Sequence, residues 1–112
     1  MDLNSFLSDV FSASGNLNFV KNIDVNTEIF LTKGKINLLD GSFLKFYYNS
    51  KTNVLSFAWI KEEKRIWGFD SDSIKGWHLH PLENPNDHVT QEPHSIPEII
   101  SQFVNVYHLI NK

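Results

Sequence analysis

Between Glu28 and Asp70 the chain alternates strand-forming segments with short polar connections, and this pattern constrains the fold more than any other feature. The segments, 28–32, 35–39, 42–48, 54–61 and 64–70, are rich in aromatic and β-branched residues. Segments of this kind that are bounded by Gly, Asn and Asp are typical of β-strands. Because such short connections join only antiparallel neighbours, the pattern predicts an antiparallel meander.

Three of the connections carry turn residues. Asp40-Gly41 is a strong hairpin signal, and we expect both central residues of that turn to adopt positive φ. Glu62-Glu63 turns the chain between 54–61 and 64–70. Lys33-Gly34 forms either a turn or a bulge within one long strand, because a lone glycine in a strand pattern has both meanings.

Alternation along the strands separates the two faces of the sheet. Every second residue from Leu55 to Trp59 lies on one face, and every second residue from Arg65 to Phe69 shares one face of the next strand. Several strands carry apolar residues on both sides, so we expect one covered face and one partly covered face. Nine Phe, three Tyr and three Trp supply rings for a compact core.

Two amphipathic segments flank the strands. Apolar residues recur at helical spacing over about residues 3–13, with Asp2 and Gly15 as start and stop signals. Ser95-Ile96-Pro97-Glu98 has the pattern of a capping box with proline in the first turn. The apolar stripe that follows extends to Ile110 and predicts a helix packed on the sheet.

These elements predict a single α+β domain over residues 1–112, in which an N-terminal and a C-terminal helix pack on an antiparallel meander of about five or six strands. No apolar run approaches the roughly 20 residues that span a bilayer, so we expect no membrane association. The first residues lack the basic region of a signal peptide. The chain has no cysteine, which excludes thiolate metal sites and fits a cytoplasmic location.

Four of the five histidines fall within seventeen residues, from His78 to His94. Trp77-His78-Leu79-His80 is typical of a short strand with both histidines on one face, and Pro81 ends it. The loop that follows carries His88 and His94. Two imidazoles at this spacing converge well enough to share a metal, a phosphate or a proton.

Three interpretations of this segment stay open. The histidines and a carboxylate could form an open His₃ or His₂-carboxylate metal site of the kind that holds catalytic zinc or non-haem iron. His78 and His80 could instead perform acid–base catalysis without a metal or other cofactor. In the third interpretation they cap a strand end, and His88 and His94 are solvated loop residues. Asp70 could orient an imidazole, although Asp70-Ser71-Asp72 is also common turn composition.

The charge distribution bears on the ligand. The net charge is −3, which excludes the whole chain as an electrostatic binder of nucleic acid. No Lys or Arg occurs from Gly76 to Asn111, whereas Glu83, Asp87, Glu92 and Glu98 do. We therefore expect an acidic setting that raises the pKa of the histidines and attracts cations. Arg65, the only arginine, either grips a phosphate or lies in a solvated hairpin tip.

The order of these features resembles a known family. Five features precede a C-terminal helix. They are an Asp-Gly-Ser turn (40–42), an aromatic strand with Trp59, the strand end Phe69-Asp70, the His78-Leu79-His80-Pro81 segment and a further histidine, His88. Over roughly residues 28–110 the chain resembles the TumE-type proteins, small single-domain toxins of two-gene toxin–antitoxin modules. The family pattern has an Asp-Asn dipeptide followed by proline and paired histidines, whereas residues 70–76 of this chain read Asp-Ser-Asp-Ser-Ile-Lys-Gly.

The resemblance implies a growth-inhibiting toxin that an antitoxin protein neutralises, with RNA as the expected substrate. Positions that match a histidine-rich site are Asp70, His78, His80 and His88. We expect a metal-independent ribonuclease in which His78 and His80 are base and acid, His88 assists and Asp70 orients. Arg65, Lys75 and Trp77 would contact the substrate. The alternatives are a metal-dependent hydrolase and a non-catalytic interaction module that forms a homodimer or a hetero-complex.

Overall fold

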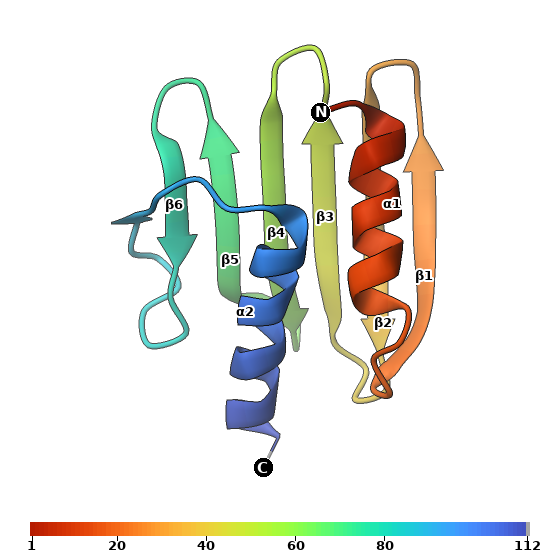
Figure 1. Ribbon diagram of the computed structural model, residues 1–112. Helices are drawn as coiled ribbons and strands as arrows, with labels where there is room; N and C mark the ends of the chain where they lie inside the picture. Colours follow the sequence, from red (N-terminus) through yellow and green to blue (C-terminus); the bar gives the residue numbers. More distant parts are fainter. Residues whose placement is uncertain (112) are drawn as a thin grey trace.

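The computed structural model describes residues 1–111 and contains two helices and one sheet (Figure 1). In chain order the elements are α1 (Leu3–Ser14), β1 (Val20–Thr27), β2 (Leu31–Leu38), β3 (Phe43–Asn49), β4 (Val54–Lys61), β5 (Lys64–Asp72), β6 (Gly76–His80), β7 (Val89–Thr90) and α2 (Ile96–Ile110). The seven strands pair antiparallel in sequence order. The predicted α+β meander with a helix before and after it is therefore confirmed. Within residues 1–111, no helix combines the length and the apolar character needed to cross a membrane.

The sheet has slightly more strands than the five or six that we predicted, because both edge strands lack an apolar signal. β1 is mostly exposed and consists largely of polar residues. β7 has only two residues, both exposed, and pairs with His78 and Leu79 of β6. Edge strands bury little of their surface, so apolar alternation does not mark them in the sequence.

Gly34 lies inside a continuous strand β2, so the alternative of a turn at Lys33-Gly34 is wrong. A Cβ at this position would lie 2.5 Å from Cζ of Phe46 and 2.1 Å from the backbone oxygen of Asp24. Glycine thus lets the Phe46 ring and strand β1 approach the backbone of β2 closely.

The Asp40-Gly41 connection does form the hairpin between β2 and β3, but its turn differs from the one that we predicted. Only Gly41 has positive φ, at 89°, and Leu38 exchanges hydrogen bonds with Gly41 and Ser42. This is the three-residue type of hairpin loop, with glycine at its left-handed position. The tight turn with two positive φ values lies instead at Glu62 and Glu63, with φ of 53° and 66°.

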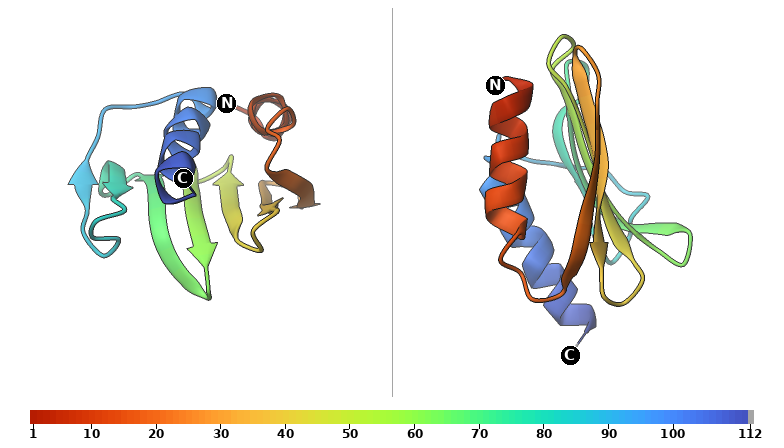
Figure 2. Two further views of the ribbon diagram at one scale, coloured as in Figure 1. Left: turned by 90° about the horizontal axis from the view of Figure 1, so that it is seen from below. Right: turned by 90° about the vertical axis from the view of Figure 1, so that its right-hand side faces the viewer.

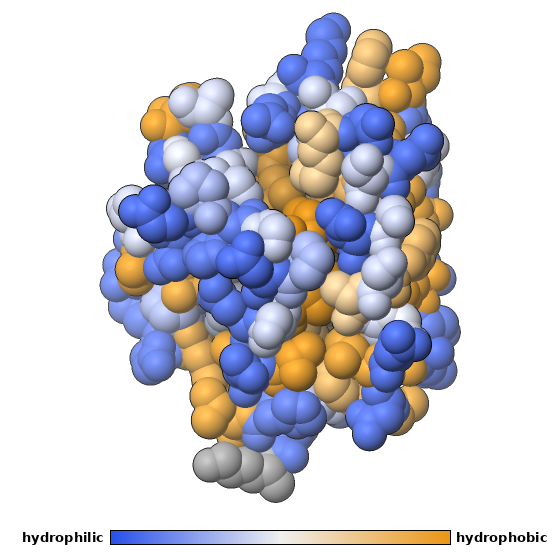
Figure 3. Space-filling view, viewed as in Figure 1, coloured by the Kyte–Doolittle hydropathy of each residue, from blue (hydrophilic) through white to orange (hydrophobic). Residues whose placement is uncertain are grey.

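Both helices pack on the same face of the sheet (Figures 1 and 2). The core between the layers is aromatic, with Trp59 and Trp67 of the central strands in contact with Phe103 of α2. On the helix side, apolar side chains remain visible between the two helices, whose outer surfaces are largely polar (Figure 3). Within residues 1–111 no helix covers the opposite face (Figure 2), which we call the open face. The loop after β6 covers part of it, since Pro85 and His88 contact His80 there, so one face is covered and the other partly covered as expected.

A β-bulge moves Arg65 onto the open face. The register passes from Trp59 opposite Trp67 to Ile60 opposite Arg65, so that strand β5 holds one extra residue there. A Cβ on Gly68 would lie 3.5 Å from Cδ of Arg65, which places the arginine beside the open side of β5. The face that alternation predicts for Arg65, shared with Trp67, is therefore wrong.

Candidate functional site

Three histidines meet at the open face of β6 and the loop that follows it. One ring nitrogen from each of His78, His80 and His88 lies within 4.8 Å of the other two. The ring centroids are 4.5 Å apart for His80 and His88, and 5.1 Å apart for His78 and His88. The convergence that any shared site requires is thus present.

Strand pairing explains how His88 reaches the other two histidines. His78 pairs with Thr90 and Leu79 with Val89, so extending the register by one residue puts His88 opposite His80 on the same face. The loop between them is held by the backbone oxygen of Pro85. This oxygen lies 3.0 Å from Nδ1 of His80 and accepts a hydrogen bond from Arg65 at 3.1 Å.

Asp70 lies between the two buried histidines. It pairs with His78 across β5 and β6, and its Oδ2 lies 2.9 Å from Nε2 of His80 and 3.4 Å from Nε2 of His78. A carboxylate in this position can accept the N–H of either ring and fix its orientation. The structure thus gives Asp70 the contacts that an orienting residue needs.

Both ring nitrogens of His80 lie beside oxygen atoms that can accept a hydrogen bond. Its Nδ1 is 3.0 Å from the carbonyl oxygen of Pro85, and its Nε2 is 2.9 Å from Oδ2 of Asp70. These two contacts hold the imidazole ring in one orientation between the loop and strand β5.

His78 and His88 differ in what surrounds their rings. Nδ1 of His78 is buried and has no hydrogen-bond partner among the described residues, an arrangement that costs about 1–3 kcal/mol. His88 is exposed. Desolvation lowers the pKa of His88 below its usual value, and the positive charges of His80 and Lys75 lower it further. His88 thus loses its proton more readily than an ordinary histidine does.

A pocket of about 340 Å³ opens above these groups. Its walls include Arg65, Lys75 and Asp72 besides Asp70 and the three histidines. None of the acidic residues Glu83, Asp87, Glu92 and Glu98 lines it. The acidic setting and raised pKa that the sequence predicts are therefore wrong for His88. The fold brings cationic side chains from β5 and the β5–β6 turn to the pocket.

Other predicted residues lie elsewhere. Trp77 is on the helix side of β6 with its ring against Phe69, at 5.9 Å between centroids, and does not line the pocket. His94 is paired with Glu98 at 3.3 Å, and His108 is exposed on α2. The structure thus brings together six of the seven predicted site residues (Asp70, His78, His80, His88, Arg65 and Lys75) and separates Trp77 from them.

Two residues of the site escaped sequence reasoning. Gly68 is paired with His80, and a Cβ there would lie 3.4 Å from Cδ2 of His80. Pro85 contributes only its backbone oxygen, which fastens the loop to His80 and Arg65. A glycine inside a strand pattern often marks a close approach, and that signal was available for Gly68. No sequence signal identifies a backbone carbonyl.

The site combines an exposed histidine of lowered pKa, a histidine–carboxylate pair and two flanking cations. Groups of this kind can transfer protons at a phosphate ester and stabilise its negative charge. The same three imidazoles could bind a transition metal. Comparison of the chain with protein-family models, with curated proteins and with solved structures identified no match.

Proposed function

We propose that the chain is a toxin-like ribonuclease of the toxin–antitoxin kind, and that its pocket cleaves RNA without a metal. The observation that carries this proposal is the convergence of His78, His80 and His88 around Asp70 within a pocket that Arg65 and Lys75 also line. The resemblance to TumE-type proteins supports it, because the matched residues are those that converge.

The geometry favours a revised division of roles among the histidines. Both nitrogens of His80 already face hydrogen-bond partners, so this residue holds the loop and Asp70 in place and does not exchange a proton with the substrate. His88 is exposed and has a lowered pKa, which suits a general base. His78 lines the pocket beside Asp70 and serves as the general acid.

The reaction then needs only these groups and RNA. His88 removes the proton of a ribose 2′-OH, and that oxygen attacks the adjacent phosphorus. The bond from phosphorus to the 5′-oxygen breaks, and His78 gives a proton to the departing oxygen. A 2′,3′-cyclic phosphate and a 5′-hydroxyl are left. Arg65 and Lys75 stabilise the charge on the non-bridging oxygens.

The test is cleavage of a labelled single-stranded RNA with EDTA present. We expect activity in the wild-type protein and a loss of at least about a hundredfold in His88→Gln, since general base catalysis is typically worth 10²–10⁴-fold. His108→Gln is the matched control, because His108 is exposed and outside the site. Equal cleavage by the His88→Gln variant and the wild-type protein would exclude the proposed mechanism.

The toxin assignment has a separate test in cells. Expression of the wild-type chain in a bacterial host should arrest growth, and His88→Gln should abolish the arrest at equal protein level. Co-expression of the neighbouring gene should relieve the arrest if it encodes the antitoxin. Growth that is unaffected by the soluble, folded wild-type chain would rule out a toxin.

A metal-dependent hydrolase is the second candidate, favoured by the ligand geometry. Three imidazole nitrogens lie within 4.8 Å of one another, and Nδ1 of His80 meets a backbone carbonyl, as metal-ligating histidines commonly do. Zinc and other metals that prefer nitrogen ligands suit this set. Stoichiometric metal in the dialysed protein, and activity that EDTA removes and zinc restores, would favour this candidate over the first.

A further inference from the structure

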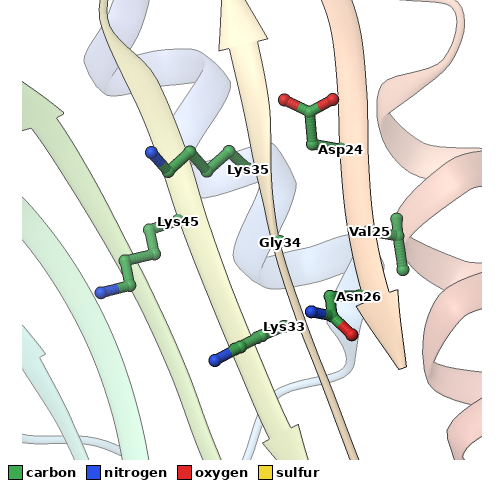
Figure 4. Close-up of a pocket in the computed structure, with 7 residues that line it drawn as sticks. All are labelled: Asp24, Val25, Asn26, Lys33, Gly34, Lys35 and Lys45. Atoms are coloured by element: carbon green, nitrogen blue, oxygen red, sulfur yellow. The ribbon is translucent and has the colours of Figure 1, made fainter. Parts of the chain in front are cut away.

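The open face carries a second group of charged side chains. They lie on the same face as the histidines but toward the opposite edge of the sheet, on strands β2 and β3. Lys33 and Lys35 of β2 and Lys45 of β3 are exposed and surround a hollow of about 420 Å³. Their side chains extend to the same side of the sheet, where Asp24 and Asn26 of β1 lie beside them (Figure 4).

The register of the sheet connects the lysines with the histidine pocket. One row of directly paired residues runs from Lys35 through Lys45, Ala58 and Gly68 to His80. Directly paired residues point to the same face, so this row crosses the open face from β2 to β6. At about 4.8 Å between strands, it spans about 19 Å.

A second row lies beside the first. It runs from Lys33 through Tyr47, Ser56 and Asp70 to His78. Ala58, Gly68 and Ser56 occupy the middle of the two rows, so the side chains between the lysines and the pocket are small, with the exception of Tyr47. Tyr47 is partly exposed and presents an aromatic ring within this path.

The positive charges of the three lysines repel one another and destabilise the folded chain when nothing is bound to them. Lys35 and Lys45 are direct partners, and like charges directly opposite each other destabilise a sheet. Asp24, the other partner of Lys35, offsets part of this repulsion. Among residues 1–111, no carboxylate lies within ion-pair distance of Lys33, Lys35 or Lys45. A polyanion would relieve the repulsion.

We infer that the open face is a binding surface for single-stranded RNA, which lies across the strands from the three lysines to the histidine pocket. This inference rests on the proposed ribonuclease function and names how its substrate is held. The lysines would contact phosphates, and the partly exposed ring of Tyr47 would stack on a base. Proteins that bind single strands combine these two elements, a cationic path and an aromatic ring.

Binding is tested separately from cleavage with a labelled 2′-O-methyl RNA, which lacks the 2′-OH that the proposed reaction needs. Fluorescence anisotropy gives Kd for the wild-type protein and for Lys35→Ala/Lys45→Ala. We expect the double variant to bind about tenfold more weakly. The slope of log K against log salt should decrease by about 1.4, since each phosphate contact on a single strand contributes about 0.7.

The matched control is Lys21→Ala/Lys51→Ala, which removes the same charge outside both rows and should leave Kd within about twofold of the wild-type value. Tyr47→Ala should weaken binding at least about fivefold, and Tyr47→Phe should restore it, because stacking needs only the ring. Equal effects of the two lysine pairs would overturn the inference. Tighter binding of duplex RNA, or equal competition by polyglutamate, would overturn it as well.

The two proposals can fail independently. RNA cleavage that depends on His88 but not on Lys35 and Lys45 would leave the ribonuclease in place and remove the proposed surface. Lysine-dependent binding of 2′-O-methyl RNA, with no cleavage of ordinary RNA, would retain the surface and remove the ribonuclease.

Discussion

The carboxylate of Asp70 lies closer to its diagonal neighbour His80, at 2.9 Å, than to its direct partner His78, at 3.4 Å. The direct partner of His80 is Gly68, which has no side chain. The His80 ring therefore occupies the space beside β5 and reaches Asp70, while its other nitrogen holds Pro85 and the loop that carries His88. Asp70 and Gly68 thus position the site from within β5.

Asp70→Asn should separate orientation from charge. Asparagine keeps the size of the side chain and can still accept one N–H, but it does not stabilise an imidazolium by charge. We expect RNA cleavage to fall by about 10- to 100-fold, the range for residues that orient a functional histidine, while the fold is retained. Single-turnover rates and circular dichroism measure the two effects. Asp9→Asn on α1 is the control, and an equal rate loss in both variants would contradict the role of Asp70.

Gly68→Ala should impair the site more than the fold. The added methyl group would lie 3.4 Å from Cδ2 of His80, 3.5 Å from Cδ of Arg65 and 3.1 Å from the backbone oxygen of Phe57. These contacts are tight but not prohibitive, so we expect at most about 1–3 kcal/mol of destabilisation and at least a tenfold loss of cleavage. Denaturant unfolding and cleavage rates are measured on the same sample. Full activity in a folded Gly68→Ala protein would show that His80 does not need this space.

Local signals predicted those parts of the fold that depend on neighbouring residues. The N-cap of α1 at Asp2 and the capping box of α2 at Ser95 and Glu98 form as the sequence predicts. The strand order follows from the short turns, because each turn leaves only one neighbour within reach. The core face of β4 follows from simple alternation.

Features that depend on distant pairing escaped prediction. The face of Arg65 is set by a bulge against Ile60, and the pairing of β5 with β6 brings this residue to the histidines. The family resemblance implied His88 as a site residue, but the pairing of β7 with β6 that carries it there was not predicted. A sequence window around Arg65 or His88 does not contain its pairing partners.

Gly34 and Phe46 should be energetically coupled. A Cβ on Gly34 would lie 2.5 Å from Cζ of Phe46, a fully buried residue of the core. We expect Gly34→Ala to cost at least about 3 kcal/mol through overpacking, because the Cβ would also lie 2.1 Å from the backbone oxygen of Asp24, so strand β1 must move. In the double variant with Phe46→Leu, the smaller side chain removes part of the clash, so the loss should be about 1 kcal/mol smaller than the sum of the single losses. Urea unfolding of the four proteins measures this coupling, and strict additivity would show that the ring does not need the glycine.

The capping box of α2 should make stability depend on pH in the acid range. Hydrogen bonds from the backbone and side chain of Ser95, and then from His94, lower the pKa of Glu98 from 4.5 to about 2. Because the pKa of Glu98 is lower in the folded than in the unfolded state, the ionised carboxylate stabilises the fold. This stabilisation is complete above about pH 4.5 and is lost as the pH falls toward about 2. Glu98→Ala should therefore lower Tm near neutral pH, and its difference from the wild-type protein should shrink over that acid window. Ser95→Ala, expected to cost about 0.5–2 kcal/mol, should keep most of its deficit over this window, because the Ser95 hydroxyl accepts the Glu98 backbone N–H whether or not the carboxylate is ionised. A difference between Glu98→Ala and wild type that stays constant down to about pH 2 would contradict the ionised capping box.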